Sequence, residues 1–383
     1  MSIATQEDPA YEPFEPEYLR WILDQGFDDI VDHYFRGELI GAERLPERGP
    51  LVLAANHSGS SFPWDAMALD ALLWRRDGQR PEARFRTVYE KILSQHWWMR
   101  PFGIDDFWRR CGGVDLTFDN FDRLLARGER VSYYPEGVAG IGKGFQNRYR
   151  LQPFSTSFLI LAARHGAPIY PVHVVNAEWV IPFNFTLKPV DLLMYKLWGV
   201  PFLPLPGGVA AILFPWIWYI ALPARMVLVV GEPIDAARLA RDEGVTDFRR
   251  PDRAAMKRVA ERVRRRWQVD LDENVRRYGR QPYHLPSLAR AFGRTRRAGR
   301  FHRVLPTNWA YWFCRLDRDR RREPARNRLH AVLRDWDLLG FYLPLGWPLL
   351  SLARALRRPP YGYRGLDDAT RRRVQGCYLW RLP

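Results

Sequence analysis

LVLAANHSGSSFPWDAMALDALLWRR, residues 51–76, sets the architecture of this chain. It begins with five apolar residues that follow Pro50, a composition typical of a buried strand. A polar loop that contains His57 comes next, and apolar residues then recur with helical spacing over residues 64–76. A strand that leads through a short loop into a helix is the repeating unit of α/β folds.

The same alternation continues on both sides of this stretch. Apolar or alternating runs predict strands at residues 84–89, 131–134, 167–175 and 224–230, and helical spacing predicts helices at residues 14–37, 117–128, 154–165 and 251–278. Asp252 is the expected N-cap of the last helix. We therefore predict an α/β sandwich with a mostly parallel sheet, an N-terminal amphipathic helix and a helical, basic C-terminal extension.

The chain has 383 residues and a net charge of +16, and most of that excess lies near its C-terminus. Residues 281–383 contain 22 arginines, no lysine and seven acidic side chains, a net charge of +15. An Arg- and Trp-rich segment of this kind favours an anionic partner, either a phospholipid surface or a nucleic acid. Because no recognisable nucleic-acid-binding motif is present, we expect a membrane surface and no nucleic acid.

Two long stretches have no charged side chain, residues 197–224 and residues 338–353. Each is either a core segment, an interfacial membrane contact or a membrane span. The five prolines of the first stretch argue against a straight spanning helix. We divide the chain into an N-terminal helical segment (residues 1–40), a main domain (residues 41–280) with the apolar insertion 197–224, and a C-terminal extension (residues 281–383).

Other compositional features narrow the class of protein. The three cysteines are widely spaced and form no CxxC pair, which argues against a disulfide scaffold and a zinc ribbon. We expect no metal site and no bound cofactor. The first twenty residues are acidic and lack the apolar core of a secretory signal. The expected location is therefore the cytoplasmic face of the membrane, with peripheral or monotopic attachment.

The polar loop after residue 55 is the main candidate for chemistry. His57 follows a strand directly, and ligands of open α/β sheets bind at such strand ends. A histidine can take a proton from a hydroxyl, and a carboxylate beside it would orient the ring. Asp65, at the start of the next helix, is the expected partner, and Asp70 is a weaker alternative. No GxSxG elbow singles out a serine nucleophile.

Further blocks follow in order along the chain: Gly112-Gly113-Val114 with Asn120–Gly128, then Tyr134-Pro135-Glu136-Gly137, and then Ala167-Pro-Ile-Tyr-Pro-Val172. Together with Asn56-His57 and Asp65 they resemble the glycerolipid acyltransferase superfamily, which includes the bacterial lysophosphatidic acid and glycerol-phosphate acyltransferases. The resemblance covers roughly residues 40–235.

The resemblance implies transfer of a fatty acyl group from acyl-CoA or acyl carrier protein to a hydroxyl of a lysophospholipid, glycerol phosphate or related lipid alcohol. His57 would be the general base and Asp65 would orient it. The partners are then a lipid acceptor and an acyl thioester donor, and the process is phospholipid biosynthesis. The expected substrate-binding residues are Asn56, Ser58, Gly59, Glu136, Gly137, Lys143, Arg148 and Arg150.

The chain departs from the family pattern at several points. Seven residues separate His57 from Asp65, where the family has four. Two basic residues that usually grip the acceptor's phosphate are absent, and Lys143, Arg148 and Arg150 are the candidates to replace them. A neutral alcohol or another headgroup is therefore an alternative acceptor. Two rival functions remain: a thioester or lipid hydrolase on the same fold, and a basic nucleic-acid- or membrane-binding protein with a degenerate enzyme domain.

Overall fold

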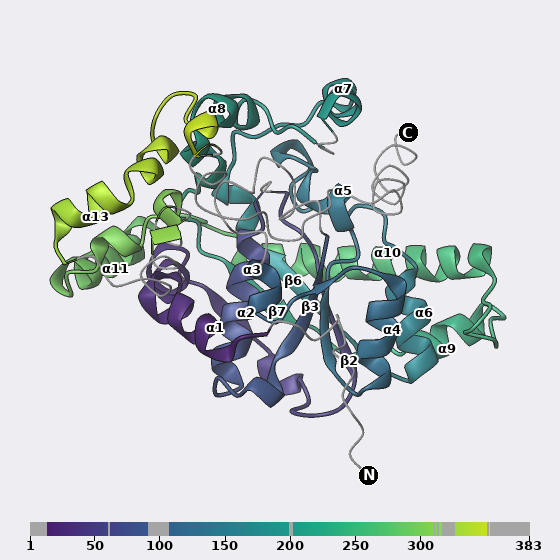
Figure 1. Cartoon of the computed structure of the whole chain (residues 1–383). Coiled ribbons are helices and arrows are strands. Elements are labelled where there is room, and N and C mark those ends of the chain that lie inside the picture. Colours follow the sequence, from purple (N-terminus) through teal and green to yellow (C-terminus); the bar gives the residue numbers. More distant parts are fainter. Residues whose placement is uncertain are drawn as a thin grey trace, which may run out of the picture.

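One seven-stranded sheet forms the centre of the molecule (Figure 1). The computed structural model describes residues 14–59, 62–90, 107–198, 202–309, 311, 314–315, 326–350 and 352. The strands are β1 (Glu38–Ile40), β2 (Leu51–Ala55), β3 (Phe85–Tyr89), β4 (Val114–Asp115), β5 (Arg130–Tyr133), β6 (Ile169–Val175) and β7 (Val227–Val230). They lie in the order β1-β7-β6-β2-β5-β3-β4, and every neighbouring pair is parallel except β6 and β7. The predicted mostly parallel sheet is confirmed.

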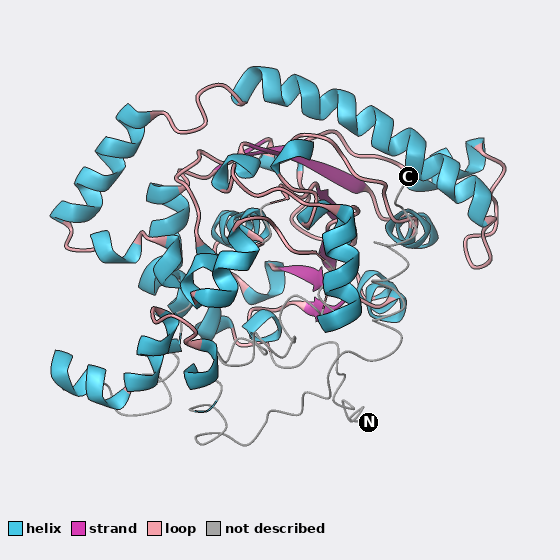
Figure 2. Ribbon diagram, turned by 90° about the horizontal axis from the view of Figure 1, so that it is seen from above, coloured by secondary structure: helices cyan, strands magenta, loops and turns pink. Residues whose placement is uncertain are grey.

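Helices cover both faces of the sheet, as the view from above shows (Figure 2). They are α1 (Pro16–Ile22), α2 (Trp64–Arg76), α3 (Phe107–Arg110), α4 (Phe118–Ala126), α5 (Gly137–Ile141), α6 (Ser157–His165), α7 (Lys188–Trp198), α8 (Gly207–Leu213), α9 (Ala236–Asp242), α10 (Arg253–Tyr278), α11 (Leu285–Arg297) and α13 (Arg328–Arg334). Strand β2 is buried on both sides. Leu51 and Leu53 pack with α1 and α2, whereas Val52 and Ala54 pack with α4, α6 and α10.

Most predicted elements occur within a few residues of their expected bounds, and α2 matches at both ends. Asp252 caps α10, since its Oδ1 accepts a 2.8 Å hydrogen bond from the Ala254 amide. The predicted N-terminal helix is a broken one. After α1 the chain continues as two short helical turns, η1 (Leu23–Phe27) and η2 (Ile30–Tyr34), and the backbone of Gly26, inside η1, is not helical.

The apolar insertion is not a single helix in the structure. Its described part contains α8 and a short helical turn, η9 (Pro215–Tyr219), separated by Phe214. Among the described residues, no helix combines the length and the apolar character that crossing a bilayer would require.

The C-terminal extension packs onto the main domain. Trp309, together with Phe341 of the turn η12 (Trp336–Phe341), belongs to the same buried cluster as Leu51 of β2. The N-terminal segment shares this cluster through Tyr18. The predicted boundaries at residues 40 and 280 therefore do not separate independent cores within the described part of the chain. The N-terminal thirteen residues and the chain after residue 352 lie outside that part.

Candidate active site

The end of strand β2 brings His57 and Asp65 together. β2 stops at Ala55, and His57 lies two residues further on; Asp65 lies in the first turn of α2. The Nδ1 atom of His57 is 3.3 Å from Oδ2 of Asp65, and both side chains are almost fully buried. His57 and Asp65, which seven residues separate in the sequence, are thus in contact. Asp70, the alternative partner, binds Thr87 instead.

The carboxylate of Asp65 is fixed from three sides. Oδ2 also accepts a 2.9 Å hydrogen bond from the Ser58 amide, and Oδ1 accepts one of 3.0 Å from the Ala66 amide. Burial on its own would raise the pKa of Asp65, but the charge and hydrogen bond of His57 and the two amides lower it below its ordinary value. Asp65 is therefore an anion in contact with the imidazole of His57.

An aromatic ring supports His57 on one face. The ring of Tyr134 stacks on the imidazole with a centroid separation of 4.1 Å and an interplanar angle of 15°. The Tyr134 hydroxyl is buried and has no hydrogen-bond partner among the described residues. Burial, and then the charges of Asp65 and Asp70, raise its pKa well above the ordinary value, so it remains a neutral phenol. Tyr134 fixes the plane of the ring without adding charge.

Glu136 and Asn56 fix the backbone around His57. Glu136 accepts a 2.9 Å hydrogen bond from the His57 amide and one of 2.6 Å from the Gln152 amide. The side chain of Asn56 makes two hydrogen bonds with the backbone of Val174 in β6. Sequence analysis assigned both residues to substrate binding. In the structure their polar atoms hold neighbouring loops and strands together.

Lys143 is also buried beneath this loop. Its Nζ atom donates a 2.7 Å hydrogen bond to the His57 carbonyl and lies 3.6 Å from Glu178, and neither side chain of this pair is exposed. Burial raises the pKa of Glu178 to about 7, against the opposing effect of Lys143. Lys143 was one of three candidates for contact with the acceptor's phosphate; in the structure its ammonium group faces protein atoms.

Two glycines allow these close contacts. A Cβ atom at Gly140 would lie 2.5 Å from Cβ of Glu136 and 3.0 Å from Cβ of His57. Gly59 has a φ of +74°, and a Cβ atom there would lie 2.6 Å from Cγ of Lys143. Any larger residue would push the loop away from His57.

The remaining predicted residues lie at the edge of the site. Gly137 has a φ of +55° in the turn that follows Glu136, and no atom lies near its missing Cβ. Arg148 and Arg150 are exposed, and Arg148 lies over the ring of Phe145. Their proposed contact with an acceptor headgroup stays a prediction. Ser60 and Ser61 lie outside the described residues. The Ser58 amide donates its hydrogen bond to Asp65.

The arrangement suits proton transfer at one atom. Nδ1 of His57 faces Asp65, while Nε2 makes no hydrogen bond within the part of the chain that the structure describes. A hydroxyl placed against Nε2 would meet a base whose protonated form is stabilised by a carboxylate. No cluster of three or more histidine, cysteine or acidic side chains suited to a metal ion occurs among the described residues.

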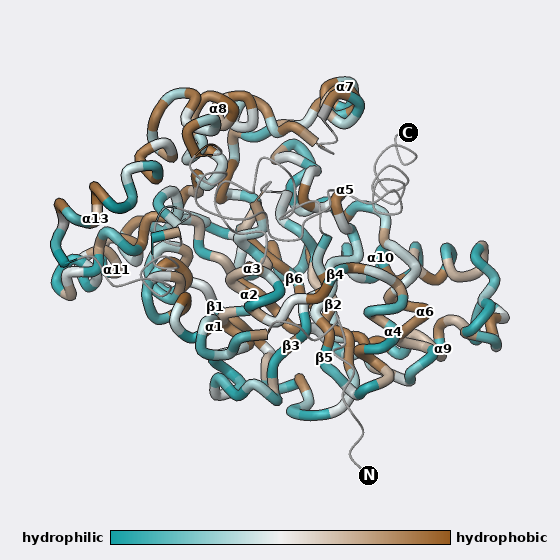
Figure 3. The backbone as a smooth tube through the Cα atoms, viewed as in Figure 1, coloured by the Kyte–Doolittle hydropathy of each residue, from teal (hydrophilic) through white to brown (hydrophobic). Residues whose placement is uncertain are grey.

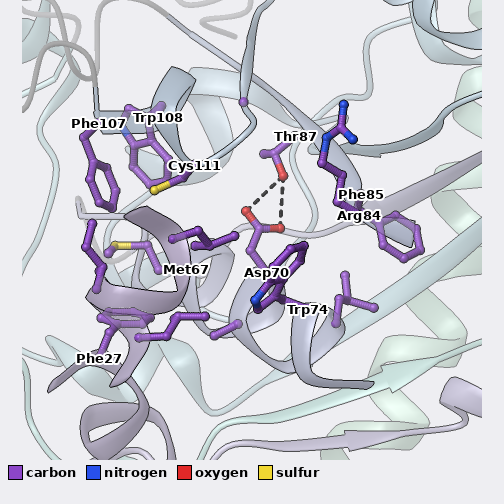
Figure 4. A pocket seen from close by; sticks show the side chains of 16 residues that line it. Phe27, Met67, Asp70, Trp74, Arg84, Phe85, Thr87, Phe107, Trp108 and Cys111 are labelled. Carbon is purple, nitrogen blue, oxygen red and sulfur yellow. Dashed lines mark hydrogen bonds between the residues drawn. The ribbon is translucent and has the colours of Figure 1, made fainter. Parts of the chain in front are cut away.

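A small apolar cavity of about 60 Å³ lies beside α2 (Figure 4). Side chains from four parts of the chain line it, among them Phe27, Met67 and Phe107. Asp70, Arg84 and Thr87 also line it, and the Thr87 hydroxyl donates a bifurcated hydrogen bond to the two carboxylate oxygens of Asp70, at 3.0 and 2.9 Å. Burial raises the pKa of Asp70 to about 7, partly offset by Thr87.

The raised pKa of Asp70 predicts a stability difference that depends on pH. The folded protein keeps this proton up to about pH 7, whereas the unfolded chain loses it near pH 4, so folding stability falls as pH rises through that window. Asp70→Asn removes the effect. The free energy of unfolding of this variant minus that of the wild type should therefore increase between pH 5 and pH 8, by at most about 3 kcal/mol. Urea denaturation at both pH values tests this, with the exposed Asp119→Asn as control. An equal difference at the two pH values would contradict it.

Tyr134 and Glu178 are not among the catalytic or substrate-binding residues predicted from the sequence. Tyr134 belongs to the Tyr-Pro-Glu-Gly block, so its position beside Glu136 was a usable signal. Glu178 follows β6, and nothing in its local sequence indicates that it pairs with Lys143, 35 residues earlier.

Part of this chain is similar to known proteins. Residues 36–175 match the model of the Acyltransferase family. An uncharacterised protein of Mycobacterium tuberculosis (strain ATCC 25618 / H37Rv) is 29% identical over 246 residues, which cover 62% of this chain and 64% of that relative. A second uncharacterised protein, from Mycobacterium leprae (strain TN), is 29% identical over 246 residues and 62% of each chain.

One solved structure also matches. It is the crystal structure of the 1-acyl-sn-glycerophosphate (LPA) acyltransferase PlsC from Thermotoga maritima, with a TM-score of 0.37 and 18% identity over 66% of this chain and 79% of that chain. The matched family segment runs from β1 to β6 and includes His57, Asp65 and Glu136. Residues 36–175 of this chain are therefore similar to the Acyltransferase family.

Proposed function

We propose that this lipid acyltransferase moves a fatty acyl group from an acyl thioester to the hydroxyl of a lipid alcohol, with His57 as the general base. The observation on which this rests is the buried His57–Asp65 pair at the carboxyl end of β2, 3.3 Å apart. The donor is acyl-CoA or acyl carrier protein. The acceptor is a lysophospholipid, glycerol phosphate or a related alcohol.

The proposed reaction needs no covalent enzyme intermediate. Nε2 of His57 takes the acceptor's hydroxyl proton while the oxygen attacks the thioester carbonyl, and Asp65 stabilises the imidazolium. The tetrahedral intermediate then breaks its carbon–sulfur bond. The leaving thiolate takes the proton from His57, so the products are an ester and a free thiol, and the enzyme returns to its starting state.

The acceptor's headgroup is the open part of the proposal. Lys143 is buried and bound to the His57 carbonyl and Glu178, which leaves the exposed Arg148 and Arg150 as the basic candidates nearest the site in sequence. With few basic groups at the site, a neutral alcohol is a serious alternative to a phosphorylated acceptor. We also propose peripheral attachment at the cytoplasmic membrane face, because both a lipid acceptor and its product partition into bilayers.

An acceptor screen tests the proposal. The purified chain is incubated with acyl-CoA and a panel of lysophospholipids, glycerol phosphate and neutral lipid alcohols, and the products are identified by mass spectrometry. For the best acceptor, Asp65→Ala should lower kcat by about 10²–10³-fold, because the imidazole loses the carboxylate that orients it. The control is Asp122→Ala, which removes the carboxylate from the peripheral His165–Asp122 pair. Equal activity of the two variants would refute the role of Asp65.

A further inference from the structure

The two uncharged stretches of the sequence meet in space. The Leu345 amide donates a 2.6 Å hydrogen bond to the Leu213 carbonyl, and Nε1 of Trp347 donates one of 2.9 Å to the Ala211 carbonyl. The ring of Phe341 lies 5.9 Å from that of Tyr219. The insertion and the C-terminal extension thus form one unit, although more than 100 residues separate them.

This unit exposes large apolar side chains on short helices. We define the apolar face by the residues Val209, Ile212, Leu213, Leu329, Val332, Leu333, Trp336, Leu339, Leu343 and Leu345, each of which is between 44% and 69% exposed. On α13 the exposed positions 329, 332 and 333 follow helical spacing, and the exposed Trp336 begins η12. In Figure 3, α8 and α13 lie along the same edge of the molecule. Clustered exposed side chains of this size mark an interaction surface.

The charge around the apolar face is one-sided. In residues 185–224 and 326–350 the only acidic residues are Asp191, Asp335 and Asp337, and all three are buried. The exposed charged side chains in these two stretches include Lys188 and Lys196 of α7 and Arg326, two residues before α13. An apolar face with an exposed basic surround complements an anionic lipid surface, where the apolar groups enter the interface and the cations meet headgroups.

The inner side of the same unit contacts the loops of the active site. Phe62, in the loop between His57 and Asp65, lies 5.0 Å from the ring of Tyr219 and 5.9 Å from that of Trp309. Val138 and Ile141, in the helix after Glu136, pack in one cluster with Phe202 and Trp218. In Figure 1, α5 and α8 both lie toward the same end of the sheet's strands. A lipid bound to this unit would therefore be one layer of side chains from the catalytic loop.

We propose that the apolar face docks the enzyme onto an anionic phospholipid bilayer and so brings the active site to its lipid substrates. This rests on the proposed function and names the surface through which it operates. The apolar side chains on these short elements insert shallowly, and the exposed Lys188, Lys196 and Arg326 attract the headgroups.

Vesicle sedimentation of the full chain tests the docking surface. The double variant Ile212→Glu/Leu333→Glu places two acidic groups in the apolar face, and the control Val269→Glu alters a 58% exposed valine on α10. With vesicles of phosphatidylglycerol and phosphatidylcholine, the double variant should partition at least 10-fold less than the wild type, and the control equally to it. The double variant Ile212→Gln/Leu333→Gln adds polar groups without charge. If circular dichroism shows that it is folded, it should also bind the vesicles less than the wild type does.

Three results separate the outcomes. Equal vesicle binding by the double variant and the control overturns the proposal. A double variant that loses self-association in light scattering while it still binds vesicles also overturns it, because the face is then an interface between two copies. His57→Ala should bind vesicles like the wild type. Vesicle binding by the wild-type chain through this face, without acyl transfer to any acceptor, would refute the proposed function and leave the docking surface standing.

Discussion

Replacement of His57 by alanine should lower kcat/KM for acyl transfer by about 10³-fold, because no other described group can take the acceptor's proton at that position. The imidazole is held by Asp65 at one nitrogen and by the ring of Tyr134 on one face. The expected loss is therefore that of a well-oriented general base, with little change in stability. Steady-state kinetics on the best acceptor measures it.

The matched control for this prediction is His165→Ala. His165 also pairs with an aspartate, at 2.8 Å from Asp122, but it lies at the end of α6 and away from the strand end. This variant should keep nearly full activity. If His57→Ala retained more than about a tenth of the wild-type rate, the assignment of the general base would fail.

Lys143→Met should lower the free energy of unfolding by about 3–5 kcal/mol, the usual effect of breaking a buried ion pair. The substitution leaves Glu178 buried without its cation and frees the His57 carbonyl. Activity should fall as well, because the loop that carries His57 loses an anchor. Urea denaturation measures the stability, and kcat measured at 10 °C reports on the loop in a folded sample.

A double-mutant cycle separates this pair from a simple loss of packing. Glu178→Gln in the Lys143→Met background removes the unpaired carboxylate and should recover part of the lost stability. Lys188→Met changes an exposed lysine and should have little effect. A loss below about 1 kcal/mol in Lys143→Met would show that the pair is not structural.

The strand and helix pattern was readable because the central elements are long and strongly apolar. β2 is buried on both faces and α2 has a clear helical repeat, so both were found with their ends. β1 and β4 have only three and two residues, too few for an alternating pattern. The N-terminal helix is broken at Gly26, where the backbone is not helical. The spacing of the apolar residues around Gly26 does not reveal this break.

The candidate site was partly readable for the same reason. His57 and Asp65 flank one loop, so a short closure brings them together, and Trp64 begins α2 with its amide bound to the Phe62 carbonyl. The role of Lys143 was not readable, because it depends on Glu178 from a distant segment. From the sequence alone, a basic residue in a Gly-rich loop is expected to be exposed to solvent, because its buried partner is not known.

The stoichiometry of the reaction with acyl-CoA and the best acceptor tests most directly whether the chain transfers an acyl group. Mass spectrometry follows the ester, a thiol reagent follows free CoA, and free fatty acid is measured in the same samples. We expect one ester for each CoA released by the wild type. With His57→Ala, we expect almost no ester and almost no free CoA. Release of free fatty acid at the same rate with and without acceptor would contradict acyl transfer and identify a thioester hydrolase.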